Sequence, residues 1–291
     1  MSGMSLLFVG LVFVIVFAVV FFNFVLKRNA QNDAMVDRLI DLNALAEREK
    51  MEKFMCDNDF YQVFQPFLDS KTEQIVGFEA LTRLNGESKS DTMPANFLKK
   101  IREENLFEKF DMFVFKKCCE WIKESENEFF VTCNFSRTTL VADGIATKIV
   151  KIADDVGVKH SAIAIEVLED VIEDCDDSIR RNITELKNSG FNIYLDDFGK
   201  PYTSINDLAA FHPDVIKLDR SMLDDIQTDD GRRLLKSVIR LVKEVGAKAL
   251  CEGVETREQA DIVKEFGCDL LQGYYFCKPT RAEKPTDFNL S

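Results

Sequence analysis

Apolar side chains follow three different patterns along this chain. The run from Leu6 to Leu26 is apolar apart from one glycine and one asparagine, and no charge precedes it. A helix of this length would span ~31 Å, which matches the ~30 Å hydrocarbon core of a bilayer. Lys27 and Arg28 follow at once, and this placement of positive charge favours a cytoplasmic location for the rest of the chain. The pattern predicts a single-pass anchor over residues 1–28, crossing the plasma (inner) membrane at residues 6–26.

The second pattern covers residues 29–56, where apolar side chains recur every three or four positions. Met35, Leu39, Leu42 and Ala46 carry the repeat, which is typical of an amphipathic helix. The repeat covers fewer than two heptads, so it favours a helical linker over a coiled coil. Pairing of two chains through this segment, which would make a homodimer, stays open.

The third pattern starts at Phe60, where short apolar runs rich in β-branched and aromatic residues alternate with longer amphipathic stretches. The predicted strands are Tyr61–Leu68, Ile75–Arg83, Phe129–Asn134, Ala162–Val167, Phe191–Asp196, Val215–Asp219, Ala247–Cys251 and Leu270–Tyr274. The predicted helices include Ala95–Glu104, Glu108–Lys123, Asp176–Asn188, Arg232–Val245 and Arg257–Phe266. This alternation indicates parallel strands joined by crossover helices, and residues 57–291 suit a (β/α)8 barrel of ~250 residues. Only Asp69–Gln74 separates the first two strands, so we expect a hairpin with an antiparallel first strand.

Polar side chains recur where these strands end. They are Glu79, Asn134, Glu166, Asp196 with Asp197, Lys217 with Asp219, Glu252 and Gln272. The carboxyl ends of barrel strands meet at one mouth, where active sites are built, so these side chains should converge. A local alternative is that each caps a helix or is a solvated loop charge. That alternative fits Asp197 or Asp219 alone, but it does not fit the glutamates, which stand in apolar strands and are poor helix caps.

Five of these side chains are carboxylates: Glu79, Glu166, Asp196, Asp197 and Glu252. Like charges this close raise one another's pKa unless a counter-charge is present. The all-oxygen donor set, with the Asn134 carbonyl, favours two Mg2+ or Mn2+ ions, which can clamp the two reacting oxygens of a phosphodiester. Lys217 would add a fixed positive charge, and Arg83 a planar fork for phosphate. The residues predict metal-dependent phosphoryl chemistry, although an enolase-type proton abstraction would use similar parts.

The composition limits the kinds of partner and of functional site that this chain can have. Lys and Arg total 37 against 50 Asp and Glu, giving a net charge of -13, which argues against binding a nucleic-acid polymer because that requires clustered cations. The two histidines lie far apart, which argues against a histidine-based zinc site or proton relay. The eight cysteines include no Cys-x-x-Cys pair and indicate buried, reduced thiols. Phe107, Phe110, Phe113 and Phe115 have the spacing of a helix packed on the barrel.

The strand-end residues stand in short motifs, which occur in a fixed order along the chain. The motifs are Gln65-Pro66, Glu79-Ala80-Leu81, Asn134-Phe135-Ser136, Glu166-Val167-Leu168-Glu169, Asp196-Asp197-Phe198-Gly199, Lys217-Leu218-Asp219, Glu252-Gly253-Val254-Glu255-Thr256 and Gln272-Gly273-Tyr274. With these motifs in this order, the sequence resembles the EAL-domain family, the phosphodiesterases of the bacterial second messenger cyclic di-GMP. The resemblance covers about residues 57–280. It implies a modified TIM barrel with an antiparallel first strand, and a reaction that opens cyclic di-GMP to linear pGpG.

The resemblance also implies a role for each matching residue. The implied metal ligands are Glu79, Asn134, Glu166 and Asp196, with Asp197 and Glu252 completing the two-metal site. The implied catalytic residues are Lys217, which positions the attacking water, and Glu252, sometimes assigned as general base. The implied substrate contacts are Gln65, Arg83, Asp219 and Gln272. Glu169 is implied to hold the loop that follows Asp197.

The chain departs from the family pattern in that loop. The usual Gly-Tyr is replaced by Pro201-Tyr202 after Lys200, and proline fixes the backbone φ angle and removes a hydrogen-bond donor. Leu84 stands where a tryptophan is common. Three hypotheses therefore remain: a membrane-anchored phosphodiesterase, a catalytically weak or inactive domain that acts as a cyclic di-GMP receptor or docks a protein, and another TIM-barrel metal enzyme. No cyclase motif is present, so a dual synthase and hydrolase is not predicted.

Overall fold

The structure, a computed structural model, describes residues 60–85, 94–125, 128–169, 171, 176–199, 208 and 211–288, with scattered positions between 35 and 53. The chain divides into two units, Met1–Asp57 and Asn58–Ser291, and the second is described below. The predicted anchor at 6–26 and the Lys200-Pro201 departure lie outside the described residues. Among the residues that are described, no helix is both long and apolar enough to span a membrane.

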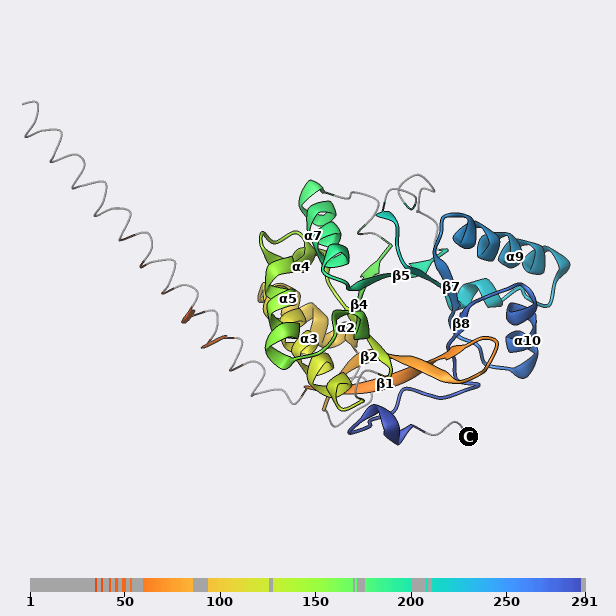
Figure 1. Ribbon diagram of the computed structural model, residues 1–291, viewed down its shortest axis with the longest axis horizontal. Coiled ribbons are helices and arrows are strands. Elements are labelled where there is room, and N and C mark those ends of the chain that lie inside the picture. Colours follow the sequence, from red (N-terminus) through yellow and green to blue (C-terminus); the bar gives the residue numbers. More distant parts are fainter. Residues whose placement is uncertain are drawn as a thin grey trace, which may run out of the picture. The chain divides into compact units, whose positions relative to one another are not determined.

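Eight strands close into a barrel in sequence order (Figure 1). They are β1 (Phe60–Asp69), β2 (Ile75–Leu84), β3 (Phe130–Asn134), β4 (Ile163–Leu168), β5 (Asn192–Phe198), β6 (Val215–Leu218), β7 (Lys248–Cys251) and β8 (Leu270–Leu271). Strand β1 runs antiparallel to both β2 and β8, whereas all other neighbours are parallel. The eight-stranded α/β barrel with an antiparallel first strand, predicted from the sequence, is confirmed.

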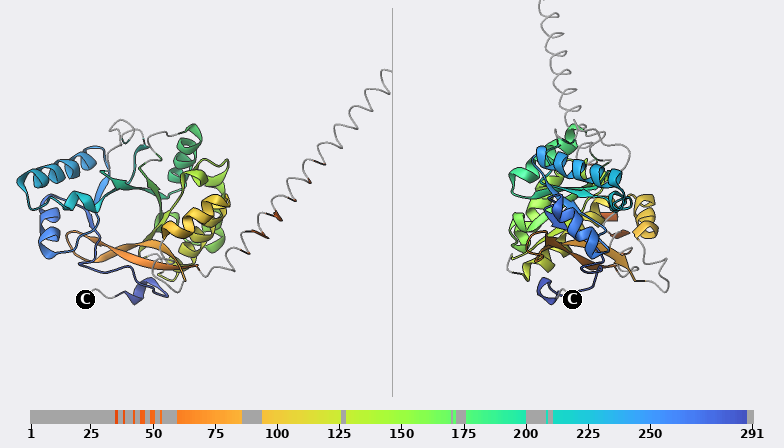
Figure 2. Two further views of the ribbon diagram at one scale, coloured as in Figure 1. Left: turned by 180° about the vertical axis from the view of Figure 1, so that it is seen from behind. Right: turned by 90° about the vertical axis from the view of Figure 1, so that its right-hand side faces the viewer.

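Helices cover the outside of the barrel, as the two views in Figure 2 show. They are α2 (Pro94–Glu103), α3 (Phe107–Lys123), α4 (Arg137–Leu140), α5 (Ile145–Val156), α7 (Asp177–Asn188), α9 (Asp229–Glu244) and α10 (Arg257–Glu265). Three short 3-10 helices are η1 (His160–Ala162), η2 (Arg220–Leu223) and η3 (Pro285–Asp287). The long β2–β3 connection holds two helices, α2 and α3, as its length predicted.

Inside the barrel, an apolar layer lies beneath the strand ends. A single cluster contains Phe67, Ala164, Tyr194, Val215, Leu250 and Leu270. Side chains of a strand alternate between its two faces, so the next inward position lies two residues further along each parallel strand. Those next positions are Glu166, Asp196, Lys217, Glu252 and Gln272, with Gln65 on the reversed strand β1. The alternation that buries the apolar layer therefore also directs the polar residues into the barrel mouth.

Strand β8 is short because the chain turns at Gly273. The predicted strand continued to Tyr274, but β8 ends at Leu271. A Cβ on Gly273 would lie 2.0 Å from the Val254 carbonyl oxygen, so the chain turns here through a close approach that only glycine allows. Beyond this turn, the C-terminal segment returns to β1, where Phe64 and Thr280 exchange two backbone hydrogen bonds of 2.9 Å.

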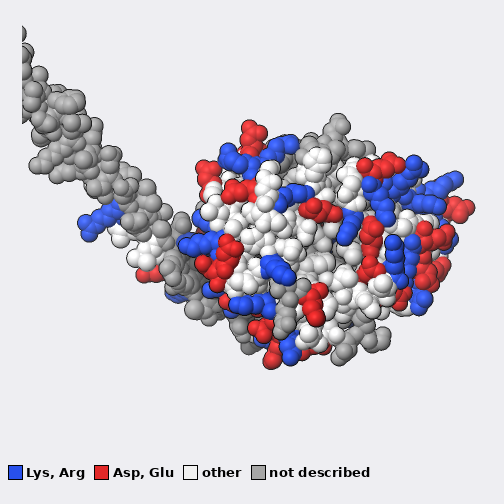
Figure 3. Space-filling view, viewed as in Figure 1, with Lys and Arg blue, Asp and Glu red and all other residues white. Residues whose placement is uncertain are grey.

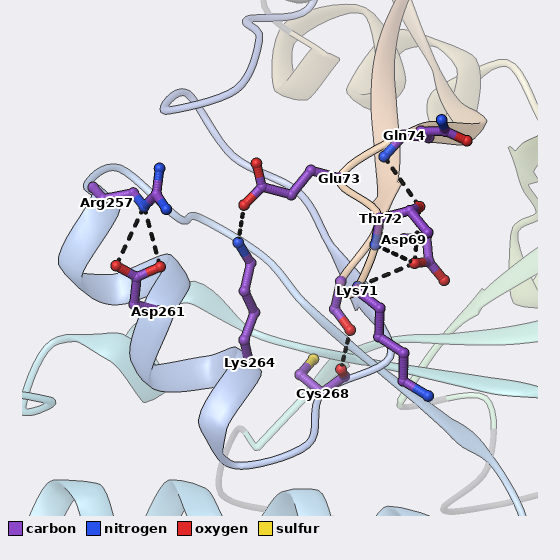
Figure 4. A network of polar contacts seen from close by, with 10 residues as sticks. Asp69, Lys71, Thr72, Glu73, Gln74, Arg257, Asp261, Lys264 and Cys268 are labelled. Atoms are coloured by element: carbon purple, nitrogen blue, oxygen red, sulfur yellow. Dashed lines mark hydrogen bonds and ion pairs between the residues drawn. The ribbon is translucent and has the colours of Figure 1, made fainter.

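The β1–β2 turn is attached to α10 at the end of the barrel opposite the mouth (Figure 4). The Asp69 carboxylate accepts hydrogen bonds from the backbone N–H groups of Lys71 (3.0 Å) and Thr72 (2.8 Å), which stabilises the tight turn. Glu73 in this turn forms an ion pair with Lys264 of α10. These contacts fix the hairpin that the six-residue spacing predicted.

On the face shown in Figure 3, basic and acidic side chains lie next to one another, especially over α9 and α10. Arg240 pairs with Glu244 at 2.8 Å, and Lys243 pairs with Asp269 at 3.1 Å. Exposed pairs of this kind contribute roughly 0–1 kcal/mol each to stability. We therefore assign the stability of the fold to the apolar core and not to these surface charges.

Gly77 gives a test of packing inside the barrel. It lies opposite Phe130 in the β2–β3 ladder, and a Cβ would meet the Phe130 ring at 2.6 Å. We expect Gly77→Ala to lower the free energy of unfolding by about 1–3 kcal/mol, because the core is already full. Urea denaturation measures the change. A Gly77→Ala/Phe130→Leu double variant should recover part of the loss, and a single variant as stable as the wild type would contradict this packing.

Candidate functional site

The Lys217 ammonium group lies at the centre of the barrel mouth. Its Nζ is 2.6 Å from Glu166 Oε1 and 2.7 Å from Glu252 Oε1. Asp196 Oδ1 lies at 3.0 Å and Glu79 Oε1 at 3.3 Å. The four carboxylates come from β2, β4, β5 and the end of β7, so the structure brings together residues that are up to 173 positions apart in the chain (252 minus 79).

Burial and mutual charge determine how these groups titrate. Burial alone would lower the pKa of Lys217, but the surrounding carboxylates, led by Asp196, raise it well above the usual value, so the side chain stays an ammonium. Burial raises the pKa of Glu166 well above its usual range. Burial likewise raises the pKa of Glu252 to about 8. Burial also acts against ionisation of Asp196, but the Lys217 charge outweighs it and holds the pKa below normal.

Three of the carboxylates have the arrangement of a metal site. Glu79, Glu166 and Asp196 each offer one oxygen, and these oxygens lie within 4.8 Å of one another. The second oxygen of Glu166, Oε2, is buried and accepts no hydrogen bond from the described residues. A buried carboxylate oxygen without a donor is costly, and a hard dication would satisfy it. The donor set therefore fits Mg2+ or Mn2+.

Two glutamines lie beside this cluster. Gln272 Nε2 donates to Glu79 Oε2 at 2.7 Å, so it orients the carboxylate from the side opposite Lys217. Gln65 is the β1 partner of Glu79 in the ladder, and its Nε2 donates to the Cys277 carbonyl oxygen at 3.1 Å. Gln272 thus acts on a candidate metal ligand, and the hydrogen bond from Gln65 to Cys277 stabilises the turn after β8.

The remaining predicted residues surround the cluster at different depths. Asn134 ends β3 with an exposed side chain, in register with Glu166. Asp197 has a positive φ of 61°, a strained conformation for a residue other than glycine. Asp219 caps η2 by accepting a hydrogen bond from the Ser221 N–H at 3.0 Å, so it has the helix-capping role that the sequence also allowed for it. Glu169 is buried at the end of β4. Its predicted contact with the loop after Asp197 falls outside the described residues, because that loop continues into 200–207.

A cavity of about 520 Å³ opens between the ends of β2 and β3 and helices α2 and α3. Its wall contains Asn134, three arginines and several phenylalanines. The arginines are Arg83, Arg102 and Arg137, and the phenylalanines are Phe97, Phe107, Phe110 and Phe135. The spacing of the α3 phenylalanines predicted packing on the barrel, and Phe107 and Phe110 also line this cavity. An aromatic and cationic wall can hold a planar base and a phosphate.

Asp111 on α3 is a residue that the motif analysis missed. It is buried, and its Oδ2 accepts hydrogen bonds from Ser136 and Thr139 next to the end of β3. Burial raises the pKa of Asp111 to about 6, although these hydrogen bonds oppose the rise. A single acidic residue on the core face of the predicted helix was the available signal, because acidic residues are rarely buried without partners.

Comparison with known proteins finds a family model and several relatives that match this chain. A family model described as EAL domain matches residues 48–279. The chain is 28% identical over 227 residues to the biofilm architecture maintenance protein MbaA of Vibrio cholerae, covering 77% of this chain and 28% of that protein. Four curated relatives are matched over only 27–32% of their own length.

Two solved structures share the fold. The PaMucR phosphodiesterase in complex with c-di-GMP matches with a TM-score of 0.70 at 24% identity, covering 77% of this chain and 98% of that one. BlrP1 of Klebsiella pneumoniae, solved with manganese and c-di-GMP, matches with a TM-score of 0.68 at 24% identity, covering 76% and 56%. At this identity the likeness establishes the barrel and not the chemistry.

The ion cluster predicts how stability depends on Lys217. We expect Lys217→Met to lower the free energy of unfolding by about 3–5 kcal/mol in EDTA, because it leaves buried carboxylates without a counter-charge. Adding Mn2+ should recover part of this loss. Urea denaturation with and without the metal measures both effects.

Lys187→Met is the matched control. Lys187 binds Asp214 at 3.0 Å at the opposite end of the barrel, so its variant should show no recovery specific to Mn2+. A Lys217→Met protein as stable as the wild type in EDTA would contradict the role given to this ammonium.

Proposed function

Because the chain belongs to the EAL domain family, we propose that it is a membrane-anchored, metal-dependent phosphodiesterase that hydrolyses cyclic di-GMP to linear pGpG. The observation that carries this proposal is the cluster of Glu79, Glu166, Asp196 and Glu252 around Lys217 at the barrel mouth. The relatives with the same fold include one described as a phosphodiesterase bound to c-di-GMP.

The chain offers oxygen donors for two dications. Glu79, Glu166 and Asp196 would hold the first Mg2+ or Mn2+ together with Asn134, while Asp197 and Glu252 would serve the second. When bound, these ions supply positive charge that stabilises the transition state of phosphodiester cleavage. BlrP1, which shares this fold, was solved with manganese, which agrees with this choice of ion.

Lys217 and Glu252 have complementary tasks in this proposal. The Lys217 ammonium is fixed by burial and can donate a hydrogen bond to the attacking water or to a phosphoryl oxygen. The Glu252 carboxylate, whose Oε1 lies 2.7 Å from the Lys217 Nζ, can accept the proton of that water. Water oxygen then bonds to phosphorus, the bond from phosphorus to the 3′-oxygen breaks, and the leaving oxygen takes a proton from solvent.

The cavity beside Asn134 is the proposed place for one guanine of the substrate. Phe107 and Phe110 give it an aromatic wall, and Arg83, four residues after Glu79 on β2, also lines it. The Arg83 guanidinium donates to the Thr82 carbonyl oxygen at 2.9 Å, which orients its planar fork. A base in the cavity would leave the adjacent phosphate beside Asn134 and the acidic cluster.

The sequence departure at Lys200-Pro201 favours a second candidate. A proline in the loop after Asp197 can alter the geometry of the second ion while leaving the first donor set intact. The domain would then bind cyclic di-GMP without hydrolysing it and act as a receptor or protein-docking module. The experiment below separates the two functions.

The test incubates the full chain with cyclic di-GMP and either Mg2+ or Mn2+ and follows pGpG by chromatography. We expect product with either metal, none in EDTA, and a loss of at least about 100-fold in Glu79→Ala and Glu166→Gln, which remove candidate metal ligands. Glu73→Gln, in the turn at the opposite end of the barrel, is the control and should retain activity. Tight binding of cyclic di-GMP without product would favour the receptor, and neither binding nor product would refute both the phosphodiesterase and the receptor.

The run Leu6–Leu26 is the proposed inner-membrane anchor, with the barrel in the cytoplasm. We expect the full chain to fractionate with membranes and to resist alkaline extraction, whereas a chain lacking residues 1–28 should become extractable. Membrane association that survives this deletion would contradict the anchor. We also propose homodimer formation through 29–56. Sedimentation of a chain lacking residues 1–28 against one lacking residues 1–56 tests it, because only the first retains this segment.

A further inference from the structure

Asn134 depends on its backbone for its orientation. The residue ends β3 beside Glu166 of β4, and its exposed side chain borders the cavity at the barrel mouth. Within the described part of the chain, no hydrogen bond to the Asn134 side chain is present. The direction of this side chain is therefore set by the segments that fix the backbone before and after it.

The backbone before Asn134 is held by the sheet. Strand β3 pairs with β4 from Val131 to Asn134, and the N–H of Phe135 still donates to the Glu166 carbonyl oxygen at 2.9 Å. The next backbone N–H, that of Ser136, leaves the sheet and donates to Asp111 Oδ2 at 2.9 Å. The chain thus changes partner from β4 to α3 within two residues of Asn134.

A single oxygen of Asp111 collects three hydrogen bonds at this point. Besides the Ser136 N–H, it accepts the Ser136 hydroxyl at 2.8 Å and the Thr139 hydroxyl at 2.6 Å. Asp111 is only 5% exposed, so its carboxylate has little water to replace these donors. Bonds to a buried carboxylate are stronger than neutral ones, and they connect α3 rigidly to the turn after β3.

Helix α4 could not hold this turn in place by itself. It has four residues, Arg137–Leu140, and one turn of helix is unstable in isolation. Ser136 is its N-cap and accepts the Thr139 N–H at 3.2 Å. The cap fixes the shape of the turn, while Asp111 fixes its position relative to the barrel.

We propose that Asp111 is a positioning residue that holds the turn after β3 so that Asn134 faces the cluster of Glu79, Glu166 and Asp196. The inference rests on the proposed function, because it takes Asn134 as a ligand of the dication. Asp111 itself touches neither the ion nor the reacting atoms. It acts through Ser136 and Thr139.

The test measures Mn2+ binding by calorimetry with the full chain, without substrate. We expect Asp111→Asn and the Ser136→Ala/Thr139→Val double variant to weaken Mn2+ binding by about 10-fold, as is usual when a residue that orients a ligand is lost. The double variant removes the donors and leaves Asp111 in place, so it tests the same contact if Asp111→Asn does not fold. Asp214→Asn is the matched control, since Asp214 accepts the Ile193 N–H at 2.7 Å at the opposite end of the barrel.

A double-mutant cycle distinguishes positioning from general stability. In an Asn134→Ala chain, Asp111→Asn should cause no further loss of Mn2+ affinity, because the side chain that it positions is gone. Equal losses with and without Asn134 would overturn the inference. Mn2+ affinity that is unchanged in both Asp111→Asn and the Ser136→Ala/Thr139→Val variant would overturn it as well. If the wild type binds no Mn2+, the proposed function fails as well, whereas normal wild-type binding with an unaffected Asp111→Asn refutes only the positioning role.

Discussion

Four carboxylates from four different strands converge on one buried ammonium group, that of Lys217. Neither partner could be buried alone, because an unpaired ion in a protein interior costs several kcal/mol. The strands that carry them must therefore close the barrel with every mouth residue in register. The requirement is visible in the ladder, where Lys217 on β6 lies opposite Leu250, and Glu166 on β4 lies opposite Tyr194. A slip by one residue would exchange an ion for an apolar side chain.

The reversed first strand serves the same constraint. It places Gln65 opposite Glu79 and brings Phe64 to the C-terminal segment at Thr280. The short β8 then lets the chain turn at Gly273 while Gln272 still reaches the Glu79 carboxylate. The seam of the barrel and the polar mouth are thus built from the same few residues, and the site is held by the closure of the sheet.

Support from outside the barrel comes through one further buried carboxylate. Asp111 on α3 accepts hydrogen bonds from Ser136 and Thr139 in the turn that follows β3, so the helix layer contributes to the geometry of the mouth. The cavity lies at the same place, between α2, α3 and the ends of β2 and β3. The proposed substrate position and the proposed support of Asn134 therefore share one wall, formed by α3.

The barrel, its reversed first strand and the residues at the strand ends could be predicted from the sequence, because alternation with period two and the spacing of strands are local properties of the chain. Glu79, Glu166 and Glu252 could be recognised since carboxylates in apolar strands have no local explanation. Their convergence with Lys217 and Gln272 was predicted, but the individual contacts were not. Packing in three dimensions sets the contacts of Lys217 with four carboxylates and of Gln272 with Glu79. It also ends β8 at Leu271 and brings Asp111 to Ser136, 25 residues away. Distance across a closed sheet depends on how all eight strands and their helices pack, and no local pattern carries that information.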